Sequence, residues 1–318
     1  MGQWHWWSSL RQRFGGASQA QRAVMDEIDR IAAETKSKLL WAKRYRRRLA
    51  APLTQALAVA RQIVEQIPGP TALDPDSWQT DIALRSLFVT PQEMRAWLGS
   101  QSAATTLEGA NGGGTRFALL VGRHHRHQIF VTERNGEIVR RDVPRQASSF
   151  EALRLMAPAA ELETVRTEVI HRILLTVFLQ ALDSITQLKE DRERLQQEHE
   201  LLEFLVHTTA RDAEKVDAAA RAAADTLPEV NRRLDELEQD VESPEGQLAH
   251  IISALKDLAN RVRIKQVVFH LNGAGTLVST HPGNDSLGSC TLAEYHFDGQ
   301  KPHVALWVKF QRETVLPP

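Results

Sequence analysis

Side chains that could bind a metal or move a proton gather near the C-terminus, where two pairs of short antiparallel strands are predicted. Alternation along these strands puts polar residues on one face: His270, Glu294, His296, His303 and Trp307. The opposite face is apolar and consists of Val267, Phe269, Leu271, Tyr295, Phe297, Val304, Leu306, Val308 and Phe310. Imidazoles and a carboxylate together could bind a transition metal or perform acid–base catalysis. Because half-solvated sheets ordinarily carry polar side chains on one face, we predict a solvated face whose groups do not converge.

Four further reactive side chains are interpreted as inert. His124, His125 and His127 lie at an expected turn between two strands, where they would diverge, and no nearby Cys, Asp or Glu completes a ligand set. Cys290 has no adjacent base in the sequence, which favours an unreactive thiol. The sequence therefore predicts no metal and no cofactor, and it favours a non-catalytic protein over an enzyme.

A basic run is the best candidate for binding nucleic acid. Within residues 43–48, the helical periodicity predicts that Lys43, Arg44, Arg47 and Arg48 share one face of a helix. Clustered Lys and Arg gain affinity for phosphates by releasing counterions. The alternatives are a solvated helix face and pairing with an acidic segment, because residues 1–70 carry 12 Lys/Arg against 5 Asp/Glu and residues 146–247 carry 11 against 22.

A seven-residue apolar repeat runs from Leu174 to Val241, and it predicts long helices that form a coiled coil or a helical hairpin. Its predicted oligomer seam is Leu174, Phe178, Ile185, Leu188, Leu195, Leu202 and Val206. Arg192 and His199 interrupt the seam, as polar residues that fix register do. The partner is either another copy or the same chain, since Pro228 and Ser243 are places where the helix could break or fold back.

The fold class predicted is mainly α with smaller antiparallel β elements, an α+β protein. We expect a basic helical region at 1–99, a flexible linker at 100–114, a three-stranded β meander at 115–145, heptad helices at 150–243 and an α+β unit at 244–318. The meander comprises strands at 117–121, 127–132 and 137–143, the last two joined by a turn at Asn135-Gly136. Pro52 predicts two helices, or one kinked helix, between residues 18 and 67.

Composition excludes two classes of protein. With 42% hydrophobic and 25% charged residues the chain is not predicted to be disordered. Its longest apolar run, Ile173 to Leu179, is too short to predict a helix that spans a membrane. The lone cysteine, Cys290, and the lack of a secretion signal favour the cytoplasm. A tryptophan-rich N-terminal segment, with Trp4 and Trp7 on one side of a short helix, could contact a membrane surface or a partner.

These observations favour a non-catalytic oligomeric scaffold or adaptor, whose long helices bind a second copy or another helical protein. Two alternatives remain open. One is a nucleic-acid-associated protein that uses the basic helix 43–48, and the other is a sensor that binds a small ligand on the C-terminal sheet.

Overall fold

The structure is a computed structural model that describes residues 17–35, 42–104, 114–135, 138–209, 218–241, 243–272, 277–278 and 286–311. The chain divides into two compact units, 1–58 with 173–258 and 59–172 with 259–318. The tryptophan-rich N-terminal segment and most of the predicted linker, residues 105–113, lie outside the described residues.

The first unit is helical. It contains α2 (Ala17–Thr35), the first part of α3 (Tyr45–Glu65), most of α7 (Leu162–Thr209), α8 (Ala218–Val241) and α9 (Pro244–Lys256). Apolar residues that recur every three or four positions are buried in these helices, among them Ile28, Ile31, Leu49, Leu53, Leu174, Phe178, Ile251 and Leu255. An amphipathic helix gains most of its stability from burying such a stripe.

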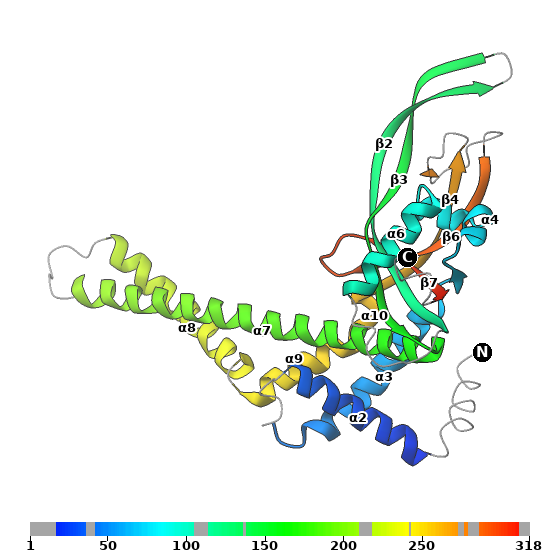
Figure 1. Ribbon diagram of the computed structural model, residues 1–318. Helices are drawn as coiled ribbons and strands as arrows, with labels where there is room; N and C mark the ends of the chain where they lie inside the picture. Colours follow the sequence, from blue (N-terminus) through cyan, green and yellow to red (C-terminus); the bar gives the residue numbers. More distant parts are fainter. Residues whose placement is uncertain are drawn as a thin grey trace, which may run out of the picture. The chain divides into compact units, whose positions relative to one another are not determined.

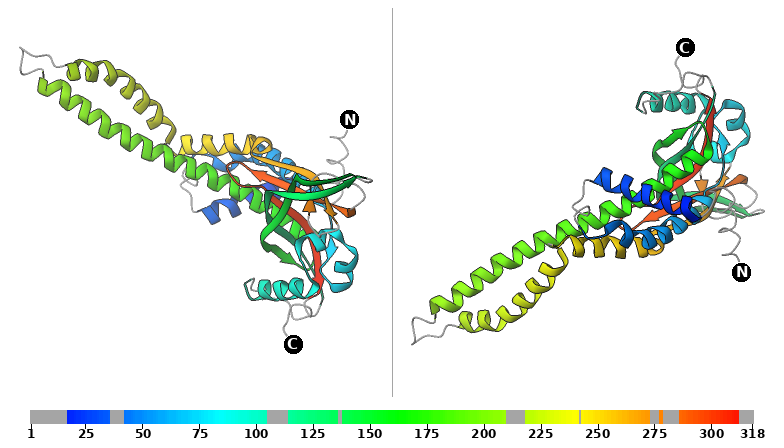
Figure 2. Two further views of the ribbon diagram at one scale, coloured as in Figure 1. Left: turned by 90° about the horizontal axis from the view of Figure 1, so that it is seen from above. Right: turned by 90° about the horizontal axis from the view of Figure 1, so that it is seen from below.

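The predicted seam lies along α7 and changes its exposure along the helix. Leu174, Phe178 and Ile185 are buried, whereas Leu188, Leu195, Leu202 and Val206 are half-buried. Figures 1 and 2 show α8 running back beside α7, so one chain supplies both helices. The seam is therefore best covered near the start of α7.

The helices end at places that the sequence did not predict. α7 ends at Thr209 and α8 begins at Ala218, so the chain reverses before Pro228, which lies inside α8. Pro52 lies inside a single helix, α3, so of the two predicted alternatives it is two helices meeting near Ala51 that the structure excludes. A proline removes one backbone donor, and a helix continues past it when surrounding contacts compensate. The helix start at Ser243 is confirmed, because the Ser243 hydroxyl accepts a hydrogen bond from the Gly246 N–H at 2.9 Å.

The second unit is a sheet packed against short helices. Its elements are β1 (Thr71–Ala72), α4 (Pro75–Thr80), α5 (Ile82–Leu87), α6 (Pro91–Ala104), β2 (Thr115–Asn135), β3 (Ile138–Ala159), α10 (Leu258–Arg261, from Ala259 on), β4 (Val262–Asn272), β5 (Leu277–Val278), β6 (Ser286–Phe297) and β7 (His303–Gln311). The hydrogen-bonded order is β1-β7-β2-β3-β5-β4-β6, and β6 also pairs with β7. Six of the described strands thus close into a ring, to which β1 adds in parallel.

Capping residues in the sequence start the short helices that cover this sheet. Asp74 and Asp81 accept hydrogen bonds from backbone N–H groups at the starts of α4 and α5. Thr90 caps α6 in the same way, since its hydroxyl accepts a hydrogen bond from the Glu93 N–H at 3.0 Å. Side chains of these helices and of the strands form one buried apolar cluster, which includes Leu84, Phe88, Met94, Leu120, Phe269, Leu292 and Leu306.

The α+β class is confirmed, but the predicted three-stranded meander is wrong. Its first two strands are one continuous strand, β2, and β3 extends to Ala159, so the long helix begins at Leu162 and not at residue 150. The start of the predicted linker, residues 100–104, belongs to α6. Two strands of more than twenty residues therefore replace three short ones.

Bulges bend the β2–β3 hairpin. The register shifts three times, and each shift matches a β3 residue with a positive φ: Asp142 (57°), Ala152 (50°) and Ala157 (53°). An extra residue on one strand bends it and increases its twist. Figure 1 shows the curved hairpin, which continues beyond β4 and β6 as a two-stranded ribbon. We call this part of the hairpin, within residues 123–146, the ribbon.

One described helix has the length and composition of a membrane span. A stretch of α7 within Leu162–His207 is long and apolar enough to cross a membrane, and 39% of it is buried inside the protein. Buried core helices of soluble proteins have the same composition, so this helix does not assign the protein to a location.

Candidate functional site

A buried carboxylate lies at the base of the ribbon. Glu294 is on β6, where it pairs in register with Lys265 of β4 and Val304 of β7. Its side chain is fully buried, with an exposed fraction of 0%. Burying a carboxylate is unfavourable unless positive charges and hydrogen bonds compensate, so its partners decide whether it is ionised.

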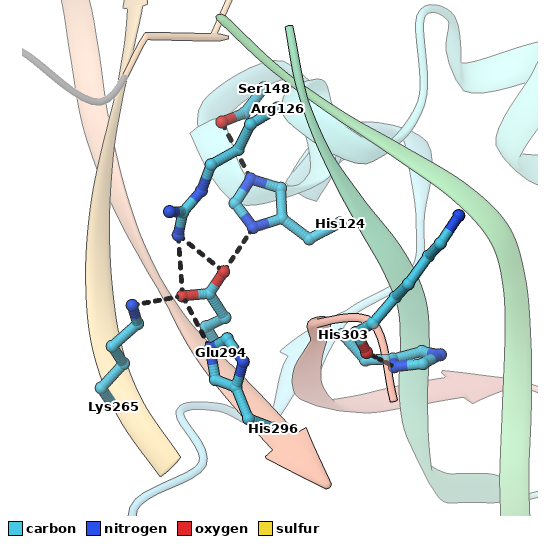
Figure 3. A network of polar contacts seen from close by, with 8 residues as sticks. His124, Arg126, Ser148, Lys265, Glu294, His296 and His303 are labelled. Atoms are coloured by element: carbon cyan, nitrogen blue, oxygen red, sulfur yellow. Dashed lines mark hydrogen bonds and ion pairs between the residues drawn. The ribbon is translucent and has the colours of Figure 1, made fainter. Parts of the chain in front are cut away.

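Three basic side chains reach the Glu294 carboxylate (Figure 3). Arg126 of β2 donates through Nη2 to both oxygens, at 2.9 and 3.0 Å. Lys265 Nζ lies 2.8 Å from Oε2, and His296 Nε2 lies 3.4 Å from the same oxygen. Arg126 and Lys265 are themselves about half exposed, so their positive charges lie between the buried carboxylate and the protein surface.

His124 completes the cluster from inside the sheet. Its Nδ1 lies 2.6 Å from Glu294 Oε1, and its Nε2 lies 2.9 Å from the Ser148 hydroxyl. Because an ionised carboxylate can only accept, Nδ1 donates to Glu294, and a neutral His124 then accepts from Ser148 through Nε2. The imidazole also packs on Phe150 and Phe269, with ring centroids 5.5 and 5.4 Å away. The site therefore joins β2, β3, β4 and β6.

Glu294 remains ionised. Burial alone would raise the pKa of its carboxyl group, but the hydrogen bonds from His124 and Lys265 and the charges of Arg126 and Lys265 outweigh burial. The net result is a pKa well below the usual range of glutamate. A permanent negative charge thus holds the base of the ribbon to the neighbouring strands.

The order Ser148–His124–Glu294 matches the order of groups in a hydrolytic triad. Acyl transfer also requires a hydroxyl that can reach a substrate and donors for the developing oxyanion. Ser148 is only 6% exposed and lies on a strand inside the unit. Glu294 is already shared with Arg126 and Lys265. We therefore interpret the chain of hydrogen bonds as a link between strands and not as a nucleophile with its base.

Beyond this cluster the same face of the ribbon is exposed. Cross-strand pairs share a face, and Arg126 pairs with Ser148, Gln128 with Gln146 and Phe130 with Pro144. Phe130 is 67% exposed, and Pro144 is exposed beside it. A hollow of about 320 Å³ lies along this part of the ribbon, lined by Arg126, His127, Gln128, Pro144, Arg145 and Gln146.

The ribbon is rich in arginine. Residues 123–146 contain six arginines and three histidines against three acidic residues, a formal charge of +3 with neutral histidines. Arg140 and Arg141 are exposed and Arg145 is half-buried, all within four residues of Pro144. Positive charge and an exposed aromatic side chain therefore occur together on one narrow element.

The predicted polar face of the C-terminal sheet is wrong in its register. Phe269 pairs with Cys290 and Lys265 with Glu294, so Glu294 shares its face with the apolar residues of β4. Glu294 and Trp307 are fully buried and not solvated. The physical reason is that the ring of strands and the helices α4–α6 leave little of this sheet half-solvated.

The histidines of that predicted face separate. His296 contacts Glu294. His303 lies outside the cluster and stacks on Tyr295, with ring centroids 5.3 Å apart. Burial lowers the pKa of His303, and the nearby charges of Arg154 and Arg123 lower it further. His270 pairs in register with Ser289. Among the described residues, no three His, Cys, Asp or Glu side chains are grouped to hold a metal ion.

The other predicted site residues lie as follows. Lys43, Arg44, Arg47 and Arg48 are all exposed, but Lys43 and Arg44 precede α3, so the four do not share one helix face as predicted. Cys290 is buried, and burial raises the pKa of its thiol to about 11, which keeps it protonated at neutral pH. His124, His125 and His127 lie within β2 and not at a turn.

Sequence reasoning named Glu294, His296 and His124 but missed three other residues of this site. Arg126, Ser148 and Lys265 were not among its candidates, and Arg126 was missed because residues 122–126 were interpreted as a turn. A signal was present: between Gly122 and Asn135 the sequence contains no Gly, Pro, Asn or Asp, the residues that ordinarily form turns. An uninterrupted strand follows from that observation.

Comparisons with family models, with curated proteins and with solved structures give no match to this chain.

Proposed function

We propose that this protein binds double-stranded DNA through the β2–β3 ribbon. The observation that carries the proposal is the exposed pair Phe130 and Pro144 on a two-stranded ribbon, with Arg140, Arg141 and Arg145 close by. The role is non-catalytic. A cytoplasmic location, as the lone cysteine indicates, is part of the same proposal.

The dimensions of a ribbon suit a DNA groove. Two-stranded β-ribbons bind B-form DNA in either groove, whereas the major groove of double-stranded RNA is too deep and narrow for side chains to read. Arginine side chains are long enough to extend from the edges of a ribbon toward the phosphates on either side. Their planar guanidinium groups also match phosphate oxygens in geometry.

The cluster at Glu294 supports this use of the ribbon. Arg126 is bound to the buried carboxylate through two contacts, and His124 is bound through a third. A ribbon held at its base loses less conformational freedom on binding than a mobile loop would. Arg126 thus positions the ribbon, and the arginines nearer its tip are the phosphate ligands.

The ribbon is a better candidate than the basic residues before and within α3. In that region Arg46 pairs with Asp29 at 2.9 Å, and the backbone N–H of Lys43 donates to Glu245 at 3.4 Å. Acidic partners inside the first unit therefore already offset part of this charge. The aromatic neighbour Tyr45 contacts Asp29 as well, at 3.5 Å, and is not free to stack on bases.

The test compares two variants that each lose three exposed or half-exposed cations. One is Arg140→Ala with Arg141→Ala and Arg145→Ala, on the ribbon. Its matched control is Lys43→Ala with Arg47→Ala and Arg48→Ala, in the first unit. Fluorescence anisotropy with a short labelled duplex, between about 50 and 200 mM salt, measures affinity and its salt dependence. We expect the ribbon variant to lower the log–log salt slope by roughly 3, and the control to leave it unchanged.

Three outcomes would contradict the proposal. The unmodified protein could show no binding at low salt; the control variant could lose as much affinity as the ribbon variant; or single-stranded DNA or double-stranded RNA could bind more tightly than the duplex. Thermal melting of both variants shows that they are folded, since exposed substitutions are expected to change the free energy of unfolding by no more than about 0.5 kcal/mol each.

Self-association through the first unit is a second candidate function, the scaffold that the apolar repeat predicts. One observation favours it: Leu201 and Phe204, one turn apart on α7, are 61% and 66% exposed. The half-buried Leu188, Leu195 and Leu202 extend the apolar character of the helix. A second copy of this chain would cover these residues in the manner that heptad repeats favour.

Sedimentation velocity tests this second candidate. We expect an oligomer for the unmodified protein and a monomer for Leu201→Glu with Phe204→Glu, because unpaired charges in an apolar interface are strongly unfavourable. The control is Gln196→Glu with Gln197→Glu, which adds the same charge at exposed positions of α7. A monomeric unmodified protein at all concentrations would exclude this candidate.

A further inference from the structure

Phe130 lies on the exposed part of the ribbon. Its side chain is 67% exposed, although burying an apolar side chain is favourable. A lone exposed apolar residue is ordinary on protein surfaces. Phe130, however, lies directly across the ribbon from Pro144, so two apolar side chains lie next to each other on the same face.

Polar side chains lie next to this apolar pair on both faces of the ribbon. Toward the base, the same face carries the pair Gln128 and Gln146, and then Arg126. Arg145 lies on the other face, where it pairs with Ile129. Amides that can bond to base edges thus adjoin the apolar pair, and guanidinium groups flank it.

We propose that Phe130 and Pro144 form a wedge that enters between two base pairs and bends the DNA. This inference rests on the proposed function, because it concerns the same ribbon. Side chains such as Phe and Pro that enter between base steps from the minor groove unstack them and kink the duplex by about 20–90° toward the major groove.

A wedge must be held firmly, and the base of the ribbon meets this requirement. Four residues before Phe130, Arg126 is fixed to Glu294 by contacts of 2.9 and 3.0 Å. Two residues earlier, His124 is buried between Phe150 and Phe269. These contacts hold the base of the ribbon in place, so the ribbon keeps its position when the wedge enters between stacked bases.

The wedge predicts a preference for particular DNA sequences. Pyrimidine–purine steps such as TA are easily unstacked, whereas A-tracts are stiff. A duplex with a central TA step should therefore bind more tightly than one with a central A-tract, because unstacking the TA step is less unfavourable. The arginines contribute equally to both, since phosphate contacts do not depend on sequence.

The experiment measures bending by energy transfer between dyes at the two ends of a duplex. It compares the unmodified protein with Phe130→Ala and with the control Ile129→Ala, which removes an apolar side chain from the opposite face. We expect increased energy transfer with the unmodified protein and with the control. For Phe130→Ala, transfer should return close to that of free DNA, the TA preference should disappear and the salt slope should stay unchanged. Phe130→Trp, which keeps a large ring, should retain bending.

The outcomes separate this inference from the proposed function. If the unmodified protein bound with a normal salt slope but did not bend the duplex, the wedge would be overturned and DNA binding would stand. Equal bending by Phe130→Ala and the unmodified protein would also overturn it. No binding to any duplex would overturn both.

Discussion

The two ends of the β2–β3 ribbon carry similar side chains on one face but use them differently. At the base, Phe150 packs on His124 and Phe269, and Ser148 and Arg126 join the network of Glu294. Nearer the tip, Phe130 and Pro144 continue the same face in water. The strands alternate identically in both places, so alternation determines the face of a residue, and only the neighbouring elements determine whether that face is buried.

This difference teaches how a long hairpin can serve two purposes. The half that pairs with β7 and β5 is part of the sheet, and its polar groups are satisfied by other strands. The half beyond those strands keeps only the pairing between β2 and β3. Substitutions at the base should therefore change stability, and substitutions near the tip should change binding. Three predictions test this division.

The largest effect is expected at the base, from Glu294→Gln. The amide cannot neutralise Arg126 and Lys265, and removing one member of a buried ion pair lowers the free energy of unfolding by about 3–5 kcal/mol. We expect the lower end, about 3 kcal/mol, because both partners can turn toward water. Urea unfolding followed by circular dichroism measures the change. A change below about 1 kcal/mol would show that the cluster does not hold the ribbon.

Much of the α+β fold could be predicted from the sequence, for identifiable reasons. The helix start at Ser243 has a local signal, and it lies where a break in the helix was predicted. The antiparallel pair formed by β6 and β7 follows from alternating apolar residues, and the structure confirms it. Each of these signals lies within a few residues of the element that it starts or defines.

The site could not be predicted, because its residues are far apart in the chain. Glu294 lies 170 positions from His124 and 168 from Arg126. Only the closure of the sheet brings them together, and a shift of register by one residue moves every side chain to the other face. The reversal between Thr209 and Ala218 was missed for a different reason: residues 210–217 contain no glycine or proline, so no local signal marks a break.

A smaller effect is expected from a matched pair of phenylalanines. Phe150→Ala removes a half-buried ring from the contacts with His124 and Phe269, and we expect a loss of about 2–3 kcal/mol, somewhat below the range for fully buried rings. Phe130→Ala removes an exposed ring and should change stability by less than about 0.5 kcal/mol. Thermal unfolding of the two variants gives both values. Equal losses would mean that the tip also packs against the protein and is not a separate binding element.

The smallest expected effect is a dependence on pH that belongs to Glu294. Because its folded pKa lies below its unfolded value of about 4.3, the ionised group stabilises the protein above that pH, and this contribution is lost as the pH falls toward the folded pKa. Many other carboxyl groups titrate in the same range, so the informative quantity is the difference in unfolding free energy between the unmodified protein and Glu294→Gln. Glutamine does not titrate, and this difference should shrink by about 1–2 kcal/mol between pH 7 and about pH 3. Phe130→Ala, at the other end of the ribbon, should follow the unmodified protein at every pH. If the difference stayed constant down to pH 3, Glu294 would have a similar pKa in both states, and its ion pairs would not stabilise the base of the ribbon.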